Sequence, residues 1–404
     1  PITISLVVAL ESFVGEKERR TIEPLLSTPF RDWQIYVGKL LVGISFPLVA
    51  SYLSIGLYLL LVSKQDLNLP AFSQILQLLA LTAVHAILMV SGALAVSTQS
   101  TSVRAANLLA SFIVIPTAFL IQGESALLFW GNGQMLWLAV IAVLIVAALI
   151  IRVGLAHFQR EHLLGREVDT LNFRWMLRTF WDQFRGEAKS PFSWYRNEIP
   201  ATLRRLMRPI LAVLLLTLVS GVLSYWFTSS LLTPVFAEVP AEEMSVVVDE
   251  FTSKSGFGEL AQPGIELTYS FIFGHNVQAV LVMLLLGLVS FGVLGGVAFV
   301  VNIGFLGAVL AFYKAIGYST WAIFTAGILP HGIFEIPAII FTCATILYFG
   351  AILVTPNPAR TMGDVFLRAL GDWAKIAVGI VLPLLAIAAA IETFITPQLL
   401  AKFI

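Results

Sequence analysis

The sequence predicts an all-α, polytopic transmembrane helical bundle of about nine to ten membrane segments, with interfacial amphipathic helices. Hydrophobic residues make up 58% of the 404 residues and charged residues only 12%, whereas apolar residues account for about half of a soluble domain. Apolar runs near the ~20 residues that cross a bilayer recur along the chain. We therefore expect an integral membrane protein.

The expected membrane segments follow from these apolar runs. In chain order they are 40–62, 75–98, 106–121, 135–151, 210–227, 277–301, 305–315, 321–354 and 376–391. Residues 1–10 resemble the end of a further membrane helix, so we expect one to precede Pro1. The single cysteine, Cys343, lies inside a segment, which excludes disulfides and a cysteine-based metal cluster.

The zero formal net charge conceals a strong segregation of basic residues. Of the 24 lysines and arginines, 20 lie in the connecting segments 11–39, 98–105, 152–208 and 355–375. The longest opposite connection, 229–275, contains seven acidic residues and one lysine. Because basic residues are enriched in cytoplasmic loops, we expect 11–39 and 152–208 in the cytoplasm and 229–275 outside.

The stretch 11–39 concentrates charge, with five basic and five acidic residues in a very apolar protein. Pro24 and Pro29 should interrupt its helical pattern, because proline lacks an amide proton and clashes with the preceding turn. We therefore expect two short amphipathic helices at the membrane surface, between two membrane helices. An interfacial helix that is solvated and has no partner is the alternative interpretation.

Within this stretch, Glu-Lys-Glu-Arg-Arg-Thr-Ile-Glu-Pro-Leu-Leu-Ser-Thr-Pro (16–29) and Tyr-Val-Gly-Lys (36–39) resemble the cytoplasmic coupling loop of type-2 ABC exporter permeases. Residues 157–161 resemble the end of that family's membrane domain, so the resemblance covers about 1–165, lacking a first helix. It implies that a separate ATPase subunit, carrying ATP and Mg, docks on the loop and moves the membrane helices. The implied coupling residues are Glu16, Glu18, Thr21 and Glu23 for charge and caps, Leu25 and Leu26 as the apolar anchor, and Pro29, Gly38 and Lys39.

Residues 166–206 form a predicted cytoplasmic linker in which basic and aromatic side chains alternate. This combination is typical of a helix that lies in the headgroup layer and is attracted to anionic lipid. A dedicated partner site is the alternative. Nucleic acid is not an expected partner, because membrane segments flank the linker.

Residues 207–404 form the predicted second membrane domain. Pro-His-Gly-Ile-Phe-Glu-Ile-Pro-Ala (330–338) resembles the P-H-G-x-x-E-x-P-A run of the stage II sporulation protein M family. Asn-Ile-Gly-Phe-Leu-Gly (302–307) resembles that family's asparagine-glycine turn, with one residue inserted. The resemblance implies five membrane helices. The family's named member anchors a cell-wall-remodelling complex in sporulating bacteria.

An intramembrane polar hinge is predicted in this second domain. Its residues are Asn302, Gly304, Gly307, Pro330, His331, Gly332, Glu335 and Pro337. His331 and Glu335 lie on one helix face, where their pairing would lower the cost of a carboxylate in the membrane. Two interpretations remain, a proton- or ligand-sensitive hinge and a structural pair that fixes a bend. We expect no metal site, because no third ligand is evident.

The most probable function by these criteria is the permease subunit of an ABC transporter, of the exporter type, in the bacterial cytoplasmic membrane. We expect no catalytic residue and no cofactor in this chain, because neither a phosphate-binding loop nor a G-x-S-x-G elbow is present. Besides the ATPase and membrane lipids, the partners considered are a second permease copy and an envelope protein at 229–275. The alternatives are a non-transporting scaffold that recruits envelope- or cell-wall-remodelling proteins and an intramembrane enzyme using His331 and Glu335.

Overall fold

The computed structural model is helical throughout the part of the chain that it describes. The described residues are 2–19, 21–65, 70–99, 133–158, 173–237, 268–355 and 362–402, with single residues and short runs within 103–125 and 239–243. No strand occurs among these residues, which confirms the all-α prediction. The chain divides into two compact units, Pro1–Met176 with Ile352–Thr361, and Leu177–Ala351 with Met362–Ile404.

Eight helices among the described residues are long and apolar enough to cross a membrane. They span Asp32–Ser63, Phe72–Thr98, Leu136–Leu155, Pro191–Ala237, Tyr269–Val289, Val293–Ala315, Thr320–Leu353 and Gly363–Phe394. The predicted segment 106–121 and the acidic stretch 244–267 lie largely or wholly outside the described residues. The helices confirm an integral, polytopic membrane protein.

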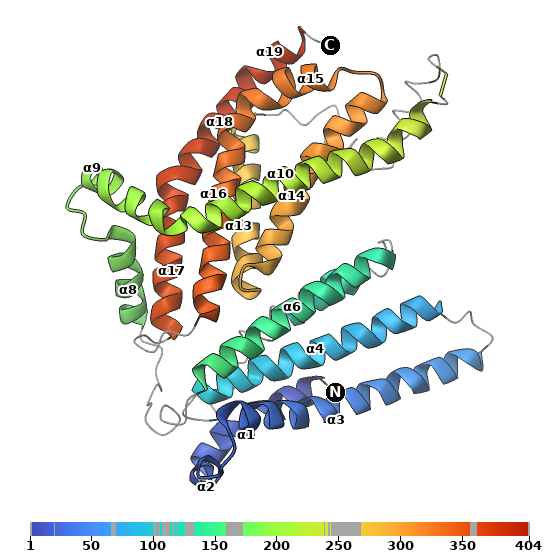
Figure 1. Cartoon of the computed structure of the whole chain (residues 1–404), viewed down its shortest axis with the longest axis vertical. Helices are drawn as coiled ribbons and strands as arrows, with labels where there is room; N and C mark the ends of the chain where they lie inside the picture. The colour runs from blue at the N-terminus through green and yellow to red at the C-terminus, as the bar shows by residue number, and fades with distance from the viewer. Residues whose placement is uncertain are drawn as a thin grey trace. The chain divides into compact units, whose positions relative to one another are not determined.

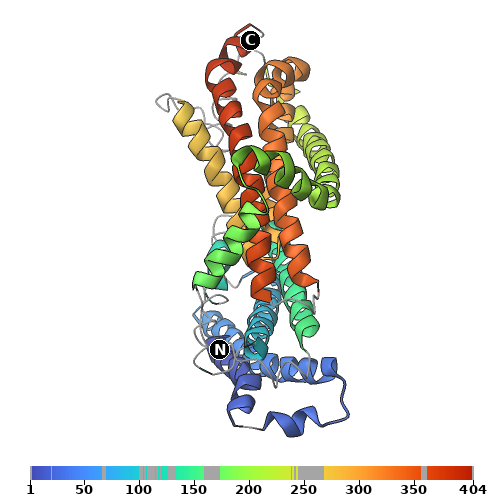
Figure 2. The same cartoon turned by 90° about the vertical axis from the view of Figure 1, so that its left-hand side faces the viewer.

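Among its described residues, unit 1 contains three long helices and two shorter ones at its amino-terminal end (Figure 1). These are α1 (Ile2–Glu18), α2 (Ile22–Leu26), α3 (Asp32–Ser63), α4 (Phe72–Gln99) and α6 (Gly133–His157). α4 packs against α1, α3 and α6, and the short α2 projects beyond the ends of α4 and α6 (Figures 1 and 2).

The core of unit 1 forms where α1, α3 and α4 meet the end of α6. Phe13 and Tyr36 are fully buried, and the ring of Phe158 lies 5.1 Å from the first and 6.0 Å from the second. Tyr36 also requires glycine at position 154, because a Cβ there would overlap its hydroxyl group. Dispersion contacts of this density hold helices together in lipid, where hydrophobic burial provides little driving force.

The stretch 11–39 folds differently from the prediction of two short amphipathic helices. α1 continues to Glu18, and only the five-residue α2 stands between it and the 32-residue α3. Pro24 lies in the first turn of α2, where its missing amide costs no helical hydrogen bond. The expected second helix is the start of α3, since only Pro29 and its neighbours interrupt the chain before Asp32.

The described residues of unit 2 form a bundle of five segments long and apolar enough to cross a membrane, with a helix alongside it (Figure 1). Its helices are α8 (Phe173–Arg185, whose first four residues precede the unit), α9 (Pro191–Ser193), α10 (Ile199–Ala237), α13 (Tyr269–Val289), α14 (Val293–Ala315), α15 (Thr320–Ala322), α16 (Leu329–Val354), α17 (Met362–Ile376), α18 (Leu382–Phe394) and α19 (Thr396–Leu400). π-helical stretches at Trp194–Glu198, Ile323–Ile328 and Ala377–Val381 connect α9 to α10, α15 to α16 and α17 to α18.

The number of membrane segments in unit 2 agrees with the prediction, but two boundaries do not. The helix expected over 376–391 begins at Met362 and runs through to Phe394. The break expected at 302–307 lies instead at Ser290–Gly292, between α13 and α14. There Phe291 and Gly292 have φ values of 52° and 91°, and the Ser290 hydroxyl accepts the amide of Leu294 at 2.8 Å.

Asn302, Gly304 and Gly307 therefore do not form a turn; they lie within α14. The two glycines face α10, where the Ser224 hydroxyl donates to the carbonyl of Gly304. A Cβ at Gly307 would overlap the carbonyl oxygen of Gly221. Small residues at a crossing let two membrane helices approach closely, so these glycines serve packing between α10 and α14.

Candidate functional site

The predicted coupling residues of unit 1 divide into buried and exposed groups. Glu16 and Lys39 face each other, while Glu18, Thr21, Glu23, Pro29 and Gly38 are exposed. Leu25 packs partly buried against the core of unit 1, and the side chain of Leu26 lies outside the described residues. The exposed residues surround α2, which Ile22 anchors in the same core.

A lysine connects α3 to α1 at the base of this region. The Lys39 ammonium donates to the Glu16 carboxylate at 2.8 Å and to the Ser12 carbonyl at 2.6 Å, and it lies 4.7 Å from the centre of the Phe13 ring. Side-chain exposure is 17% for Lys39 and 32% for Glu16. The two charges are thus directed at each other, and neither is presented to a partner.

A serine in α4 secures the same part of α1. Ser97 is fully buried, and its hydroxyl accepts the amides of Phe13 and Val14 at 3.1 and 3.0 Å and donates to the carbonyl of Leu10. Lys17 adds a bond of 2.9 Å to the carbonyl of Thr98, and burial lowers the pKa of Lys17 to about 8. The sequence placed Ser97 at the end of the expected membrane segment 75–98 and gave no indication of this role, because a serine at a helix end gives no distinguishing pattern.

Two large aromatic side chains stand exposed beside α2. Phe30 is 57% and Trp33 52% exposed. Together with Glu18, Thr21, Glu23 and Pro29 they define what we call the α2 surface. This surface combines aromatic and acidic groups on and around α2, which Ile22 anchors in the core of unit 1. The prediction placed the apolar anchor on Leu25 and Leu26 and did not include either aromatic residue.

Unit 1 also contains a polar pair within its membrane helices. His85 Nδ1–H of α4 donates to the Leu81 carbonyl at 3.0 Å, and its Nε2 lies 3.6 Å from a carboxylate oxygen of Glu124. The pair borders a cavity of about 200 Å³ that Gln74 and Thr82 also line. The second member of the pair, Glu124, lies near the end of the described run 120–125.

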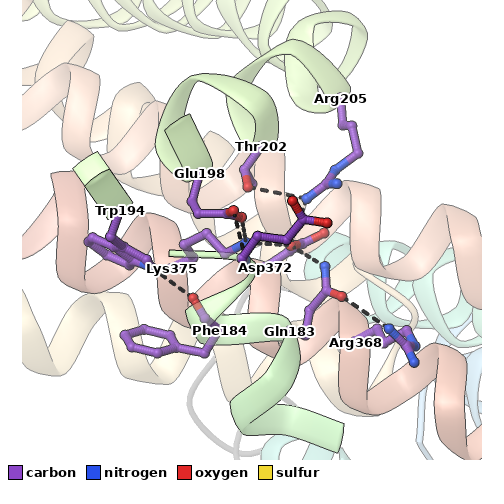
Figure 3. A network of polar contacts seen from close by, with 10 residues as sticks. Gln183, Phe184, Trp194, Glu198, Thr202, Arg205, Arg368, Asp372 and Lys375 are labelled. Carbon is purple, nitrogen blue, oxygen red and sulfur yellow. Dashed lines mark hydrogen bonds and ion pairs between the residues drawn. The ribbon is translucent and has the colours of Figure 1, made fainter. Parts of the chain in front are cut away.

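Unit 2 carries a polar network where α8, α10 and α17 meet (Figure 3). Lys375 is only 1% exposed and lies 3.2 Å from Glu198 and 3.7 Å from Asp372. Asp372 also accepts bonds from Arg205 at 2.9 Å and Gln183 at 2.7 Å. Because Gln183 belongs to α8 and Asp372 to α17, the network ties α8 alongside α17 (Figures 1 and 2).

An indole extends this network to the turn between α8 and α9. The Trp194 indole donates to the carbonyl of Phe184 at 2.7 Å (Figure 3), and the two rings lie 5.3 Å apart. Other aromatic residues of α8, including Phe173 and Trp181, remain exposed. α8 therefore joins the membrane helices through one face and leaves an aromatic face for other contacts, such as lipid headgroups.

The predicted intramembrane residues of α16 lie beside a second acidic residue. His331 Nε2 is 4.0 Å from Glu335, and Glu392 of α18 completes a group whose ligand atoms all lie within 4.8 Å of one another. His331 Nδ1 is 3.2 Å from the Thr396 hydroxyl. The expectation of no metal site rested on the absence of an evident third ligand, and Glu392 is a candidate for that position. The available signal was an acid in the apolar run 376–395, but only packing places it opposite α16.

Three further residues of the predicted hinge, Pro330, Gly332 and Pro337, lie close in sequence to His331 and Glu335. Pro330 and Pro337 both lie in α16, which follows directly on the π-helical stretch Ile323–Ile328. A π-helical turn and a proline each disrupt the regular hydrogen-bond ladder of a helix. The structure brings this part of the predicted hinge together but leaves Asn302, Gly304 and Gly307 in a different packing contact.

Two family models match the chain. Residues 2–122 match the ABC-2 type transporter model, and residues 210–397 match the Stage II sporulation protein M model. These matches confirm both resemblances that the sequence motifs indicated. Permeases of the ABC-2 family are membrane transport subunits that work with an ABC ATPase subunit. No curated protein and no solved structure matches the chain.

Proposed function

We propose that this chain, which joins an ABC-2 type transporter region to a stage II sporulation protein M region, is the membrane-spanning permease subunit of an ABC exporter. A separate ATPase, which binds ATP and Mg, docks on the α2 surface and drives transport. The match over residues 2–122 supports the permease role and includes this entire surface. The chain itself contributes no catalytic residue to ATP hydrolysis.

The observation that carries the proposal is the composition of the α2 surface. Exposed aromatic residues are the most frequent energetic anchors of protein interfaces, and Phe30 and Trp33 are both more than half exposed. Glu18 and Glu23 flank them and would steer the approach of a basic groove. Aromatic anchors with an acidic rim suit a protein partner better than the surface of an anionic membrane, which would repel the acids.

The contacts that link α2 to the other helices of unit 1 can transmit its movement. Ile22 fixes α2 in the core, Lys39 joins α3 to α1, and Ser97 joins α4 to α1. A displacement of α2 would therefore move three helices together. Glu16 and Lys39 act in this mechanism as an internal connection, and the direct contact falls to Glu18, Thr21, Glu23, Phe30 and Trp33.

The charge distribution supports a setting for this transporter. Basic residues concentrate in 11–39 and 152–208, which favours a cytoplasmic location for both segments in a bacterial cytoplasmic membrane. The exposed aromatic residues of α8 would then lie at the headgroups of the cytoplasmic membrane. Lipids and a second permease copy are the further partners that we propose.

Mild-detergent purification of the full chain followed by an ATPase assay tests the proposal. We expect an ATPase to co-purify with the wild type, and Trp33→Ala and Glu23→Arg to lower the bound ATPase at least tenfold. Glu187→Arg is the matched control, because Glu187 is an exposed acid on another cytoplasmic segment. This control should retain the wild-type amount of bound ATPase.

Two results would contradict the proposal. One is a purified, folded wild type without ATPase; the other is an ATPase whose binding is equal in Glu23→Arg, Trp33→Ala and the control. Recovery of envelope proteins that depend on residues 229–275, in place of an ATPase, would favour the scaffold alternative. In that case the match over residues 210–397 would carry the function.

A further inference from the structure

The cluster of His331, Glu335 and Glu392 combines the side chains of two membrane helices. His331 and Glu335 are one turn apart on α16, and Glu392 reaches them from α18. One imidazole nitrogen and two carboxylate oxygens lie within 4.8 Å of one another. All three residues belong to unit 2, so the arrangement depends on the packing of a single compact unit.

The charges in this cluster are not balanced by the protein. His331 is the ion-pair partner of Glu335, and among the described residues no lysine or arginine pairs with Glu335 or Glu392. Side-chain exposure is 15% for His331 and 24% for Glu335, within helices that cross the membrane. Two adjacent carboxylates in such a place repel each other unless they share a cation or a proton.

The imidazole is oriented for ligation. Its Nδ1 lies 3.2 Å from the hydroxyl of Thr396, while its Nε2 faces Glu335. When Nδ1–H donates to this hydroxyl, the lone pair of Nε2 points to the carboxylates. A second hydrogen bond that fixes the tautomer and ring orientation is the usual companion of a metal-binding histidine.

We infer that His331, Glu335 and Glu392 form a binding site for one divalent transition-metal ion. Imidazole with two carboxylates is a donor set that suits Zn²⁺ and similar ions, whereas Ca²⁺ and Mg²⁺ prefer oxygen alone. Three protein ligands leave at least one position for water or another ligand. Thr396 is a positioning residue for His331, and the site joins α16 to α18 through the ion.

Cobalt titration of the untagged, chelator-treated full chain in detergent tests the inference. Tetrahedral Co²⁺ has visible absorption bands that report its ligands, and Zn²⁺ should displace it. We expect saturation at one ion per chain, loss of the bands in His331→Ala, and at least tenfold weaker binding in Glu335→Gln and Glu392→Gln. Thr396→Val should weaken binding about tenfold, the lower end for residues that orient a ligand.

His275→Ala is the matched control, because it removes an exposed imidazole from the same unit. It should leave both the stoichiometry and the spectrum unchanged. A second measurement uses only the wild type: Zn²⁺ should raise the midpoint of thermal unfolding, and zinc-edge X-ray absorption should give nitrogen and oxygen ligands including one imidazole. This measurement remains decisive if a variant fails to fold.

Three results would overturn the inference. The first is the absence of saturable binding to the folded wild type. The second is binding that Glu392→Gln leaves unchanged, since Glu392 is the residue that completes the set. The third is an unfolding midpoint of the wild type that Zn²⁺ does not raise, since an ion that joins α16 to α18 must stabilise the folded protein.

Discussion

Each compact unit uses a lysine to connect its membrane helices near the segments assigned to the cytoplasm, but the two lysines are embedded differently. Lys39 in unit 1 pairs with one carboxylate, Glu16, and is 17% exposed. Lys375 in unit 2 is 1% exposed and lies against two carboxylates, one of which is also bound by Arg205. The same side chain thus makes a simple connection in one unit and occupies the centre of a network in the other.

The difference relates to what lies next to each lysine. Beside Lys39 is α2, with Phe30 and Trp33 exposed for a partner. Around Lys375, the polar atoms of Gln183, Glu198 and Asp372 are directed at one another (Figure 3). A contact between only two groups can shift when a partner moves α2. A network whose polar groups are already bonded to one another resists such movement. We propose that unit 1 transmits motion and that the network of unit 2 provides rigid support.

The largest effect should come from Lys375→Met. This change leaves Glu198 and Asp372 buried with less compensation, and loss of one partner of a buried ion pair costs about 3–5 kcal/mol. Unfolding of the purified protein in mixed detergent, followed by tryptophan fluorescence, measures it. Lys189→Met is the control, because Lys189 is exposed. Equal stability of the two variants would refute a rigid network in unit 2.

Gly307→Ala should have the next largest effect, and it tests helix packing in unit 2. A Cβ at Gly307 would overlap the carbonyl of Gly221, and overpacking of a close contact costs about 1–3 kcal/mol. Gly304→Ala is a control one turn away, where the added Cβ would meet Ser224 at an ordinary 3.7 Å. The same unfolding assay should separate the variants, and a stable Gly307→Ala would show that α10 and α14 are less closely packed.

Ser97→Ala tests how firmly unit 1 holds α1. Loss of the hydroxyl leaves the amides of Phe13 and Val14 without this acceptor, and an unsatisfied buried group costs about 1–3 kcal/mol. Ser91→Ala is matched to it, because Ser91 is equally buried in α4 and its hydroxyl bonds only to its own helix. Hydrogen exchange of residues 10–19 should rise in Ser97→Ala and stay constant in the control.

The smallest effect on stability, about 1 kcal/mol, is expected for Lys39→Met, since its ion pair is partly open to solvent. The substitution should reduce coupling more than stability. The ATPase should still bind, but its activity should change less in response to the permease. A double-mutant cycle with Glu16→Gln isolates the pair. Additive effects of the two substitutions would show that Lys39 and Glu16 do not work as one connection.

The sequence motifs indicated the location of the candidate sites better than their geometry. The charged run 16–29 and the run 330–338 each lie in a region that a family model matches. The residues of the coupling motif differ in exposure. Glu16 and Lys39 face each other, whereas Glu23 faces solvent. Charge and spacing along a chain specify a helix face, but only packing decides which face is covered.

The break between α13 and α14 illustrates the same limit. Apolar composition continues from 277 to 301, so hydropathy contained no signal for the turn at Ser290–Gly292. That turn depends on a close approach of α16, where a Cβ at Gly350 would overlap the carbonyl of Phe291. The Asn-Gly cluster looked like the better candidate because asparagine and glycine are frequent in turns.

By itself, the sequence determined the class of this protein, its two family regions and the segregation of its charge. These properties depend on composition or on the order of residues along the chain, so they can be predicted without knowledge of contacts. Tertiary structure alone decided that Ser97 holds α1, that Lys375 lies at the centre of a network and that Glu392 meets His331 and Glu335. Each of these is a contact between residues far apart in the chain, and only the packing of helices brings such residues together.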